Sequence, residues 1–284
     1  MKILIKLCFV VMATALLLMS CSNDNNTPET PKNELDGLVK IKELKNDTHI
    51  VELYSASGNL YRGYNDVKLR IKNIGTNEYE KNAIISWLPL MHMTTRTHSC
   101  PISEVEKITA NGTFYGGYIV FQMNGSAEEP WDIKIDYKIA DKSYSVTDFI
   151  DVLPAPKRNI EVFNGTDGQR YIVALVEPKS PKVAVNDLTI GVWKMENMMS
   201  FPIVDDYTVI IDPRMPSMGN HSSPNNVNAK QLRSDKLYQG KLSLTMTGYW
   251  KINLQLADKE GTTLKGEEVT DTNESSSIYF EIEF

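Results

Sequence analysis

The side chains best suited to chemistry in this 284-residue chain are methionines and histidines gathered in two loops. The first loop carries Met91, His92, Met93 and His98, and the second carries Met215, Met218 and His221. Thioether and imidazole groups together favour copper, particularly Cu(I), whereas zinc more often recruits a carboxylate or several cysteines. The loops therefore predict a copper site. The competing interpretation is that methionine fills gaps in a core and that histidine is an ordinary loop residue.

Other soft groups lie near these loops. Met123 and Met246 end two apolar strands, on faces whose alternation favours core packing, but a methionine at a strand end could also complete a metal site. Cys100 follows His98 closely and could bind metal or sense redox state, although a single thiol is weak evidence. Met195, Met198 and Met199 form a third group, for which exposed loop filler is the favoured interpretation and additional soft ligands the alternative.

The elements that must position these loops are strands. Short runs such as 67–71, 83–88, 133–137 and 252–256 place an apolar residue at every second position and are separated by Gly, Pro, Asn and Asp. This period of two is typical of half-buried strands, and no segment has a sustained helical period. The sequence predicts an all-β fold.

The chain also repeats itself. Residues 115–125 align with residues 238–248, sharing a first Tyr, a Gly two positions later, a Met and a closing Gly. At the same offset a His-Ser-x-Pro segment recurs, and further matches are Trp131 with Trp250 and Asn65 with Asn186. We therefore expect two tandem immunoglobulin-like antiparallel β-sandwich domains, with both tryptophans in their cores. Their expected bounds are 37–153 and 160–284, joined by a stiff proline-rich linker at 154–159.

The N-terminus predicts export. Lys2 and Lys6 precede an apolar run, 7–19, that is too short to span a bilayer, and the segment ends Leu18-Met19-Ser20-Cys21. This resembles a lipobox, so residues 1–20 are predicted to be a lipoprotein signal peptide and Cys21 to be lipidated. Residues 21–36 would then be a polar, flexible tether. The expected location is the cell envelope, anchored in the outer membrane on its periplasmic face or at the cell surface.

Several functions are not indicated. The formal net charge of −6 mixes both signs, so no basic surface for nucleic acid is expected. The sequence contains no Gly-x-Ser-x-Gly, His-Glu-x-x-His, phosphate-binding glycine loop or Cys-x-x-Cys motif, and we expect no enzymatic activity. With Cys8 in the leader and Cys21 lipidated, Cys100 would have no partner for an intrachain disulfide.

The second repeat resembles a known family. Met215-Pro216-Ser217-Met218, then His221, the strand begun by Tyr238 and the segment from Met246 to Trp250 are similar to the YtkA-like domain, which is related to FixH-like domains. The resemblance implies an immunoglobulin-like domain associated with copper and with no catalytic activity of its own. The first repeat resembles a diverged copy, with Met91-His92-Met93 in place of Met-Pro-x-Met.

Two hypotheses about function follow. The first is a non-enzymatic lipoprotein that handles or delivers copper, working with an envelope copper-transport or oxidase-assembly protein and centred on residues 213–224. The second is a surface or scaffolding lipoprotein whose sandwich domains bind a protein or glycan partner. In the second, the Met/His loops are packing or contact residues.

Overall fold

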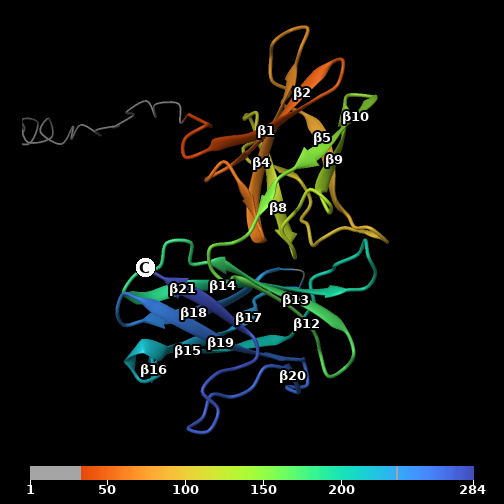
Figure 1. Ribbon diagram of the computed structural model, residues 1–284. Helices are drawn as coiled ribbons and strands as arrows, with labels where there is room; N and C mark the ends of the chain where they lie inside the picture. The colour runs from red at the N-terminus through yellow and green to blue at the C-terminus, as the bar shows by residue number, and fades with distance from the viewer. Residues whose placement is uncertain (1–32, 235) are drawn as a thin grey trace, which may run out of the picture. The chain divides into compact units, whose positions relative to one another are not determined.

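The computed structural model describes residues 33–234 and 236–284, and residues 37–284 form one compact unit. The predicted signal peptide, the lipidated Cys21 and most of the tether lie outside the described residues. Within them the chain is built of strands, with one short 3₁₀ turn at Pro216–Met218. The predicted all-β class and the tandem immunoglobulin-like sandwiches are confirmed (Figure 1).

The first sandwich packs two antiparallel sheets face to face (Figure 1). One sheet has the order β1 (Val39–Lys45), β2 (His49–Ser55), β4 (Gly63–Asn73), β8 (Tyr115–Phe121) and β7 (Glu106–Lys107). The other has the order β10 (Lys142–Ile150), β9 (Trp131–Ile139), β5 (Ala83–His92) and β6 (Thr97–His98). A short parallel pair, β3 (Leu60–Tyr61) with β11 (Val152–Leu153), lies beside them. Alternate residues such as Leu53, Leu69 and Ile133 point inward and are fully buried, as the period of two requires.

The second sandwich repeats this plan with continuous strand pairing. Its order is β12 (Ile160–Asn164), β13 (Arg170–Glu177), β14 (Ala184–Met195), β18 (Tyr238–Leu244), β17 (Val227–Gln231), β15 (Thr208–Met215), β19 (Tyr249–Ala257) and β20 (Thr263–Lys265). Two further strands, β16 (His221–Ser222) and β21 (Tyr279–Glu283), pair with β15 and β19 respectively. The sheet is continuous because β17 pairs with both β18 and β15.

Equivalent residues of the two sandwiches make the same hydrogen bonds. The Asn65 amide donates to the carbonyls of Tyr61, Gly63 and Ile119, and its oxygen accepts from the Tyr61 N–H. The Asn186 amide makes the same four bonds, to Lys182, Ala184 and Leu242 and from the Lys182 N–H. Both repeat tryptophans are fully buried and donate Nε1–H to a methionine carbonyl, Trp131 to Met123 and Trp250 to Met246.

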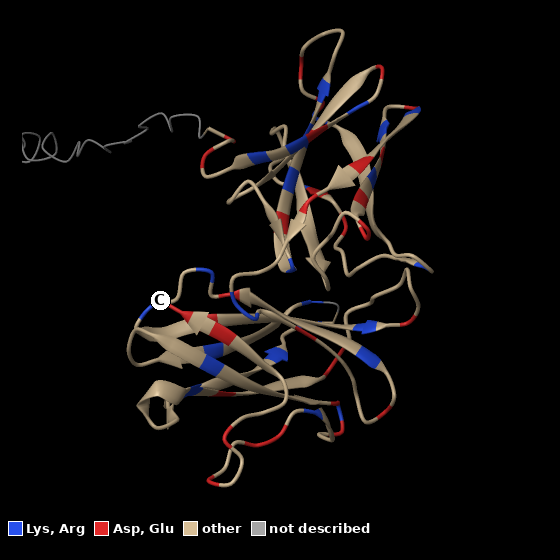
Figure 2. Cartoon of the chain, viewed as in Figure 1, with Lys and Arg blue, Asp and Glu red and all other residues tan. Residues whose placement is uncertain are grey.

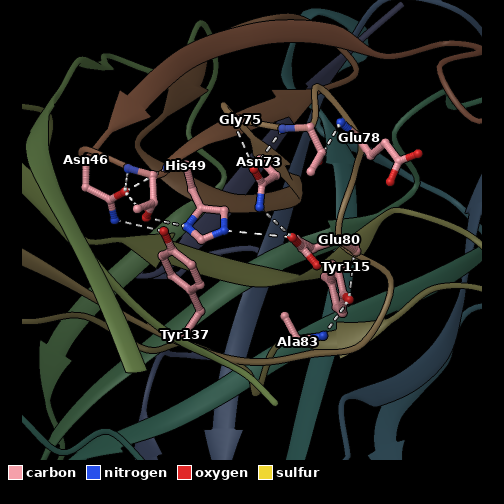
Figure 3. A network of polar contacts seen from close by, with 11 residues as sticks. Asn46, His49, Asn73, Gly75, Glu78, Glu80, Ala83, Tyr115 and Tyr137 are labelled. Carbon is pink, nitrogen blue, oxygen red and sulfur yellow. Dashed lines mark hydrogen bonds and ion pairs between the residues drawn. The ribbon is translucent and has the colours of Figure 1, made fainter. Parts of the chain in front are cut away.

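A buried polar network joins the two sheets of the first sandwich (Figure 3). His49 is 2% exposed, and its ring lies edge-on to Tyr137 and Tyr144, at centroid distances of 5.5 and 4.6 Å. Its Nδ1 lies 2.9 Å from the Thr48 hydroxyl, and its Nε2 lies 3.8 Å from a Glu80 carboxylate oxygen. Burial lowers the pKa of His49 and the Glu80 charge only partly opposes this, so the ring is neutral near pH 7.

This network predicts an acid-sensitive first sandwich. Because the folded-state pKa of His49 lies below its unfolded value, the unfolded chain binds more protons, and stability is lost as pH falls below about 6.5. We expect His49→Phe, which keeps an aromatic ring in this packing, to flatten the dependence of the unfolding free energy on pH between about 5 and 7. Urea unfolding at several pH values measures it, with the exposed His221→Gln as control. Parallel curves for wild type and His49→Phe would contradict the assignment.

The two sandwiches share a small apolar cluster of their own. Val120 of the first packs with Ile160, Ile172, Ala174, Trp193 and Phe201 of the second, and all six are buried. The Ser99 N–H donates to the Met198 carbonyl at 2.8 Å, and Lys179 forms an ion pair with Asp66. After the linker prolines, the Arg158 N–H donates to Glu281 of β21. Buried apolar area and polar bonds, and not the linker alone, therefore hold the sandwiches together.

Candidate functional site

The ligands predicted in the second loop do not converge. Met215 is the last residue of β15, is 2% exposed and packs in the second core, where its methyl occupies the space beside Gly248. Met218 is 56% exposed in the 3₁₀ turn, and His221 is exposed on β16. The loop that carries the family resemblance thus has one methionine facing the core while Met218 and His221 face solvent.

The candidate ligands of the first loop also lie in different surroundings. Met91 is buried in the first core, and His92 lies with Nε2 2.7 Å from the Asp132 carboxylate. Met93 and His98 instead line an open cavity. Among the described residues, no three His, Cys, Asp or Glu side chains are grouped so that they could hold a metal ion.

The three additional candidate ligands also lie in different parts of the structure. Cys100 is completely buried, and burial raises the pKa of its thiol well above the usual value, so it is not a reactive thiolate. Met246 packs against the second core, as its alternation predicts. Met123 does not follow that interpretation: it lies just beyond β8, is 39% exposed and faces the same cavity as Met93 and His98.

That cavity lies where the first-sandwich loop meets the second sandwich, and we call it the cleft. Its volume is about 500 Å³. Met195, the last residue of β14, and Met198, which follows that strand, line it together with Phe201. The hydrogen bond from Ser99 to the Met198 carbonyl holds the two loops against each other. The structure therefore gathers four thioethers and one imidazole from both repeats at a place that neither loop predicts alone.

The His98 ring is fixed within the wall of the cleft. It is 8% exposed and lies edge-on to Trp131 at a centroid distance of 5.5 Å. Its Nδ1 is 2.7 Å from the Ser99 carbonyl oxygen, and because a carbonyl only accepts, Nδ1 carries a proton. In the neutral ring this leaves Nε2 as the acceptor.

The cleft is positively charged. Its lining contains Arg62, Arg96, Arg158 and Arg170 against a single carboxylate, Glu161. Glu161 is 5% exposed, accepts from Arg158 Nε at 2.6 Å and from the Tyr279 N–H at 2.9 Å, and raises the pKa of Arg158. This pair is neutral, which leaves three guanidinium groups uncompensated.

The remaining polar groups of the cleft are incompletely bonded. Arg62 donates from Nε to the Gln122 carbonyl at 3.0 Å. Arg96 and Arg170 are exposed, and no carboxylate of residues 33–234 or 236–284 lies within ion-pair distance of either. The side-chain Oε1 of Gln122 is buried without a hydrogen-bond partner in the described part of the chain. A buried acceptor of this kind is costly unless a ligand or water donates to it.

Part of this site is predictable from the sequence. Met93, His98 and Met123 are among the predicted ligands, and loop filler is the favoured interpretation of Met198, whereas the arginines are not predicted. The arginines belong to four separate segments, so no local motif could signal them. Elsewhere acidic and basic residues are interspersed over both sandwiches (Figure 2), which makes the imbalance in the cleft a local property.

Residues 33–234 and 236–284 contain no candidate membrane-spanning helix.

Comparison with known proteins gives no family. No family model matches the chain, and no curated protein does. Among solved structures, the FdeC adhesin of Escherichia coli is similar over 81% of each chain, with 9% identity and a TM-score of 0.23. A chimeric tandem of titin Z1Z2 domains carrying a GRGDS peptide from fibronectin is similar over 80% of this chain and 95% of that chain, with 10% identity and a TM-score of 0.17. At these values neither likeness bears on function.

Proposed function

We propose that this chain is a non-enzymatic binding protein of the cell envelope, which holds a macromolecular partner in the cleft between its two sandwiches. The observation that carries the proposal is the cleft itself, with a volume of about 500 Å³ and uncompensated arginines. This volume is that of a small-molecule site, so the cleft takes a short segment of such a partner. Of the two hypotheses from the sequence, the surface or scaffolding protein is the one that this site favours.

The cleft suits a binding site because the sandwiches that form it are held together, whereas its methionine side chains are flexible. The buried cluster around Trp193 and the bond from Ser99 to Met198 hold the sandwiches in place. Met93, Met123 and Met198 have flexible, polarizable side chains that adjust to the shape of an apolar ligand. A preformed site with adaptable contacts binds without a large ordering cost.

The location in the envelope rests on the N-terminal sequence. A short apolar run ending in Ser20-Cys21 supports lipidation of Cys21, and the polar segment after it would let the sandwiches stand away from the membrane. The membrane and the ligand of the cleft are then separate partners, the first bound through lipid and the second through protein side chains.

Site-specific photo-crosslinking in the producing cells tests this function. p-Benzoylphenylalanine would replace Met123 or Met198 in the cleft and, as controls, Met218 or Leu232, which are 56% and 74% exposed elsewhere. We expect discrete crosslinked adducts from the two cleft positions and none from the controls. Adducts that are equal at all four positions, or absent from the cleft, would reject the proposal.

A second candidate is soft-metal binding, favoured by the four thioethers and the imidazole in the cleft. These are Cu(I) ligands, and delivery to an envelope copper-transport or oxidase-assembly protein would be the associated role. The three uncompensated arginines oppose it, since a cation gains nothing from a positive site.

Titration of the unlipidated protein with Cu(I) against a chromophoric chelator tests the candidate. It predicts competition that Met123→Leu with Met198→Leu weakens and that Met218→Leu with His221→Gln leaves unchanged. Absence of competition at micromolar protein would exclude a copper role for the cleft. Weakening by the second pair alone would return the site to residues 213–224.

A further inference from the structure

We propose that the occupant of the cleft is an acidic peptide segment whose carboxylates alternate with apolar side chains; this rests on the cleft being the binding site. The charge of the cleft favours an anionic ligand. The chain as a whole is negative, with a formal net charge of −6, yet the cleft has four arginines and one carboxylate. A positive site on a negative protein selects an anionic ligand and repels other copies of the protein.

The guanidinium groups of the cleft favour carboxylates as the anions. Arg96 comes from the first sandwich and Arg170 from the second, and both are exposed and free of ion pairs with the described residues. A guanidinium group offers two parallel N–H donors that match the two oxygens of a carboxylate. Carboxylates spaced along one ligand can therefore contact both sandwiches at once.

The apolar part of the lining favours a peptide over an acidic glycan. The cleft also presents the thioethers of Met93, Met123 and Met198 and the ring of Phe201, which suit aliphatic side chains. Among the described residues, the rings of the lining are those of Phe201 and His98, which are only 9% and 8% exposed, so no open platform is offered for stacking a sugar. Gln122 Oε1 has no donor among the described residues, and a peptide backbone N–H is a suitable donor for it.

Fluorescence anisotropy with defined probes tests the proposal. The probes are a labelled pool of decapeptides that alternates Asp or Glu with Leu, Val or Met, the same pool with Lys or Arg at the charged positions, and a heparin octasaccharide. We expect the acidic pool to bind most tightly, with a dissociation constant that rises with salt. Arg96→Gln with Arg170→Gln should weaken its binding by about tenfold or more.

The control variant also removes two positive charges, but outside the cleft. Lys138→Gln with Lys259→Gln removes two exposed cations outside the cleft and should leave binding within about twofold of wild type. Thermal melts of both double variants confirm that each is folded, as expected for exposed positions.

Three results would overturn the proposal. They are equal binding of the acidic and basic pools, unchanged binding in the arginine variant, and binding of heparin without binding of the acidic pool. Cleft-specific crosslinks at Met123 together with any of these results would retain the cleft as the site and reject only the acidic peptide. Loss of the crosslinks as well would reject both.

Discussion

Trp193→Ala is expected to lower the free energy of unfolding by about 3–5 kcal/mol and to uncouple the two sandwiches. The side chain is 1% exposed and packs in the cluster that joins them, and its ring lies over Gly191, where an added Cβ would be 1.9 Å from it. Its Nε1 is 3.4 Å from the Tyr118 hydroxyl across the junction. Alanine would leave a cavity there and remove the largest side chain of the cluster.

Calorimetry measures both effects. Wild type should unfold in one transition, because the buried cluster couples the sandwiches, and Trp193→Ala should unfold in two. Trp250→Ala is the matched control: it removes an equally buried tryptophan from the second core alone and should destabilise without altering the junction. A single transition in Trp193→Ala with a loss below about 1 kcal/mol would contradict the coupling.

Glu52→Gln is expected to cost about 3 kcal/mol of stability. Glu52 is 5% exposed and accepts hydrogen bonds from Lys40 at 2.6 Å, Arg70 at 2.6 Å and Tyr54 at 2.9 Å. Arg70 in turn lies 4.0 Å from the centre of the Tyr79 ring. Removing the carboxylate charge would leave the largely buried guanidinium group of Arg70 without its counter-charge. A buried charge without a partner is strongly destabilising.

Glu52 also makes the free energy of unfolding depend on pH in the acid range. Burial by itself would raise the pKa of Glu52, but the hydrogen bonds from Lys40, Arg70 and Tyr54 lower it to about 2. The stabilisation is therefore present above the unfolded value of about 4.5 and is lost as pH falls toward 2. Glu52→Gln should be less stable at pH 7 but lose less stability between pH 5 and 2.

Unfolding by urea across this range checks the prediction, with Glu43→Gln as the control. Glu43 also contacts Lys40, but its side chain is 35% exposed, so its loss should cost less than about 1 kcal/mol. Equal pH slopes in wild type and Glu52→Gln would show that the Glu52 cluster does not carry the acid sensitivity.

The fold followed from local patterns because each sandwich is built from alternating strands. The same alternation also indicates that two of the candidate ligands, Met215 and Met91, point into the cores. In β15 the residues Val209, Ile211, Pro213 and Met215 all face inward, and in β5 the residues Ile85, Trp87, Pro89 and Met91 do the same. Met215 and Met91 therefore belong to the cores, and their residue type alone was misleading.

The cleft could not be predicted because it depends on how the two sandwiches pack against each other. Met123 and Met198 are distant in sequence and both line the cleft because the two sandwiches pack together there. The first loop, which departs more from the YtkA-like pattern, contributes Met93 and His98 to the cleft. The second loop, which is closer to that pattern, contributes no residue to the lining.

The central claim is that the cleft, and not the loop at 213–224, is the binding surface. The most direct measurement is NMR of protein labelled with [ε-¹³C]methionine, titrated with the acidic decapeptide pool, because each methionine reports its own surroundings. We predict concentration-dependent shifts of the Met93, Met123, Met195 and Met198 methyl signals, with Met215 and Met218 unchanged. Shifts confined to Met215 and Met218, or no shifts at any of the six, would contradict the claim.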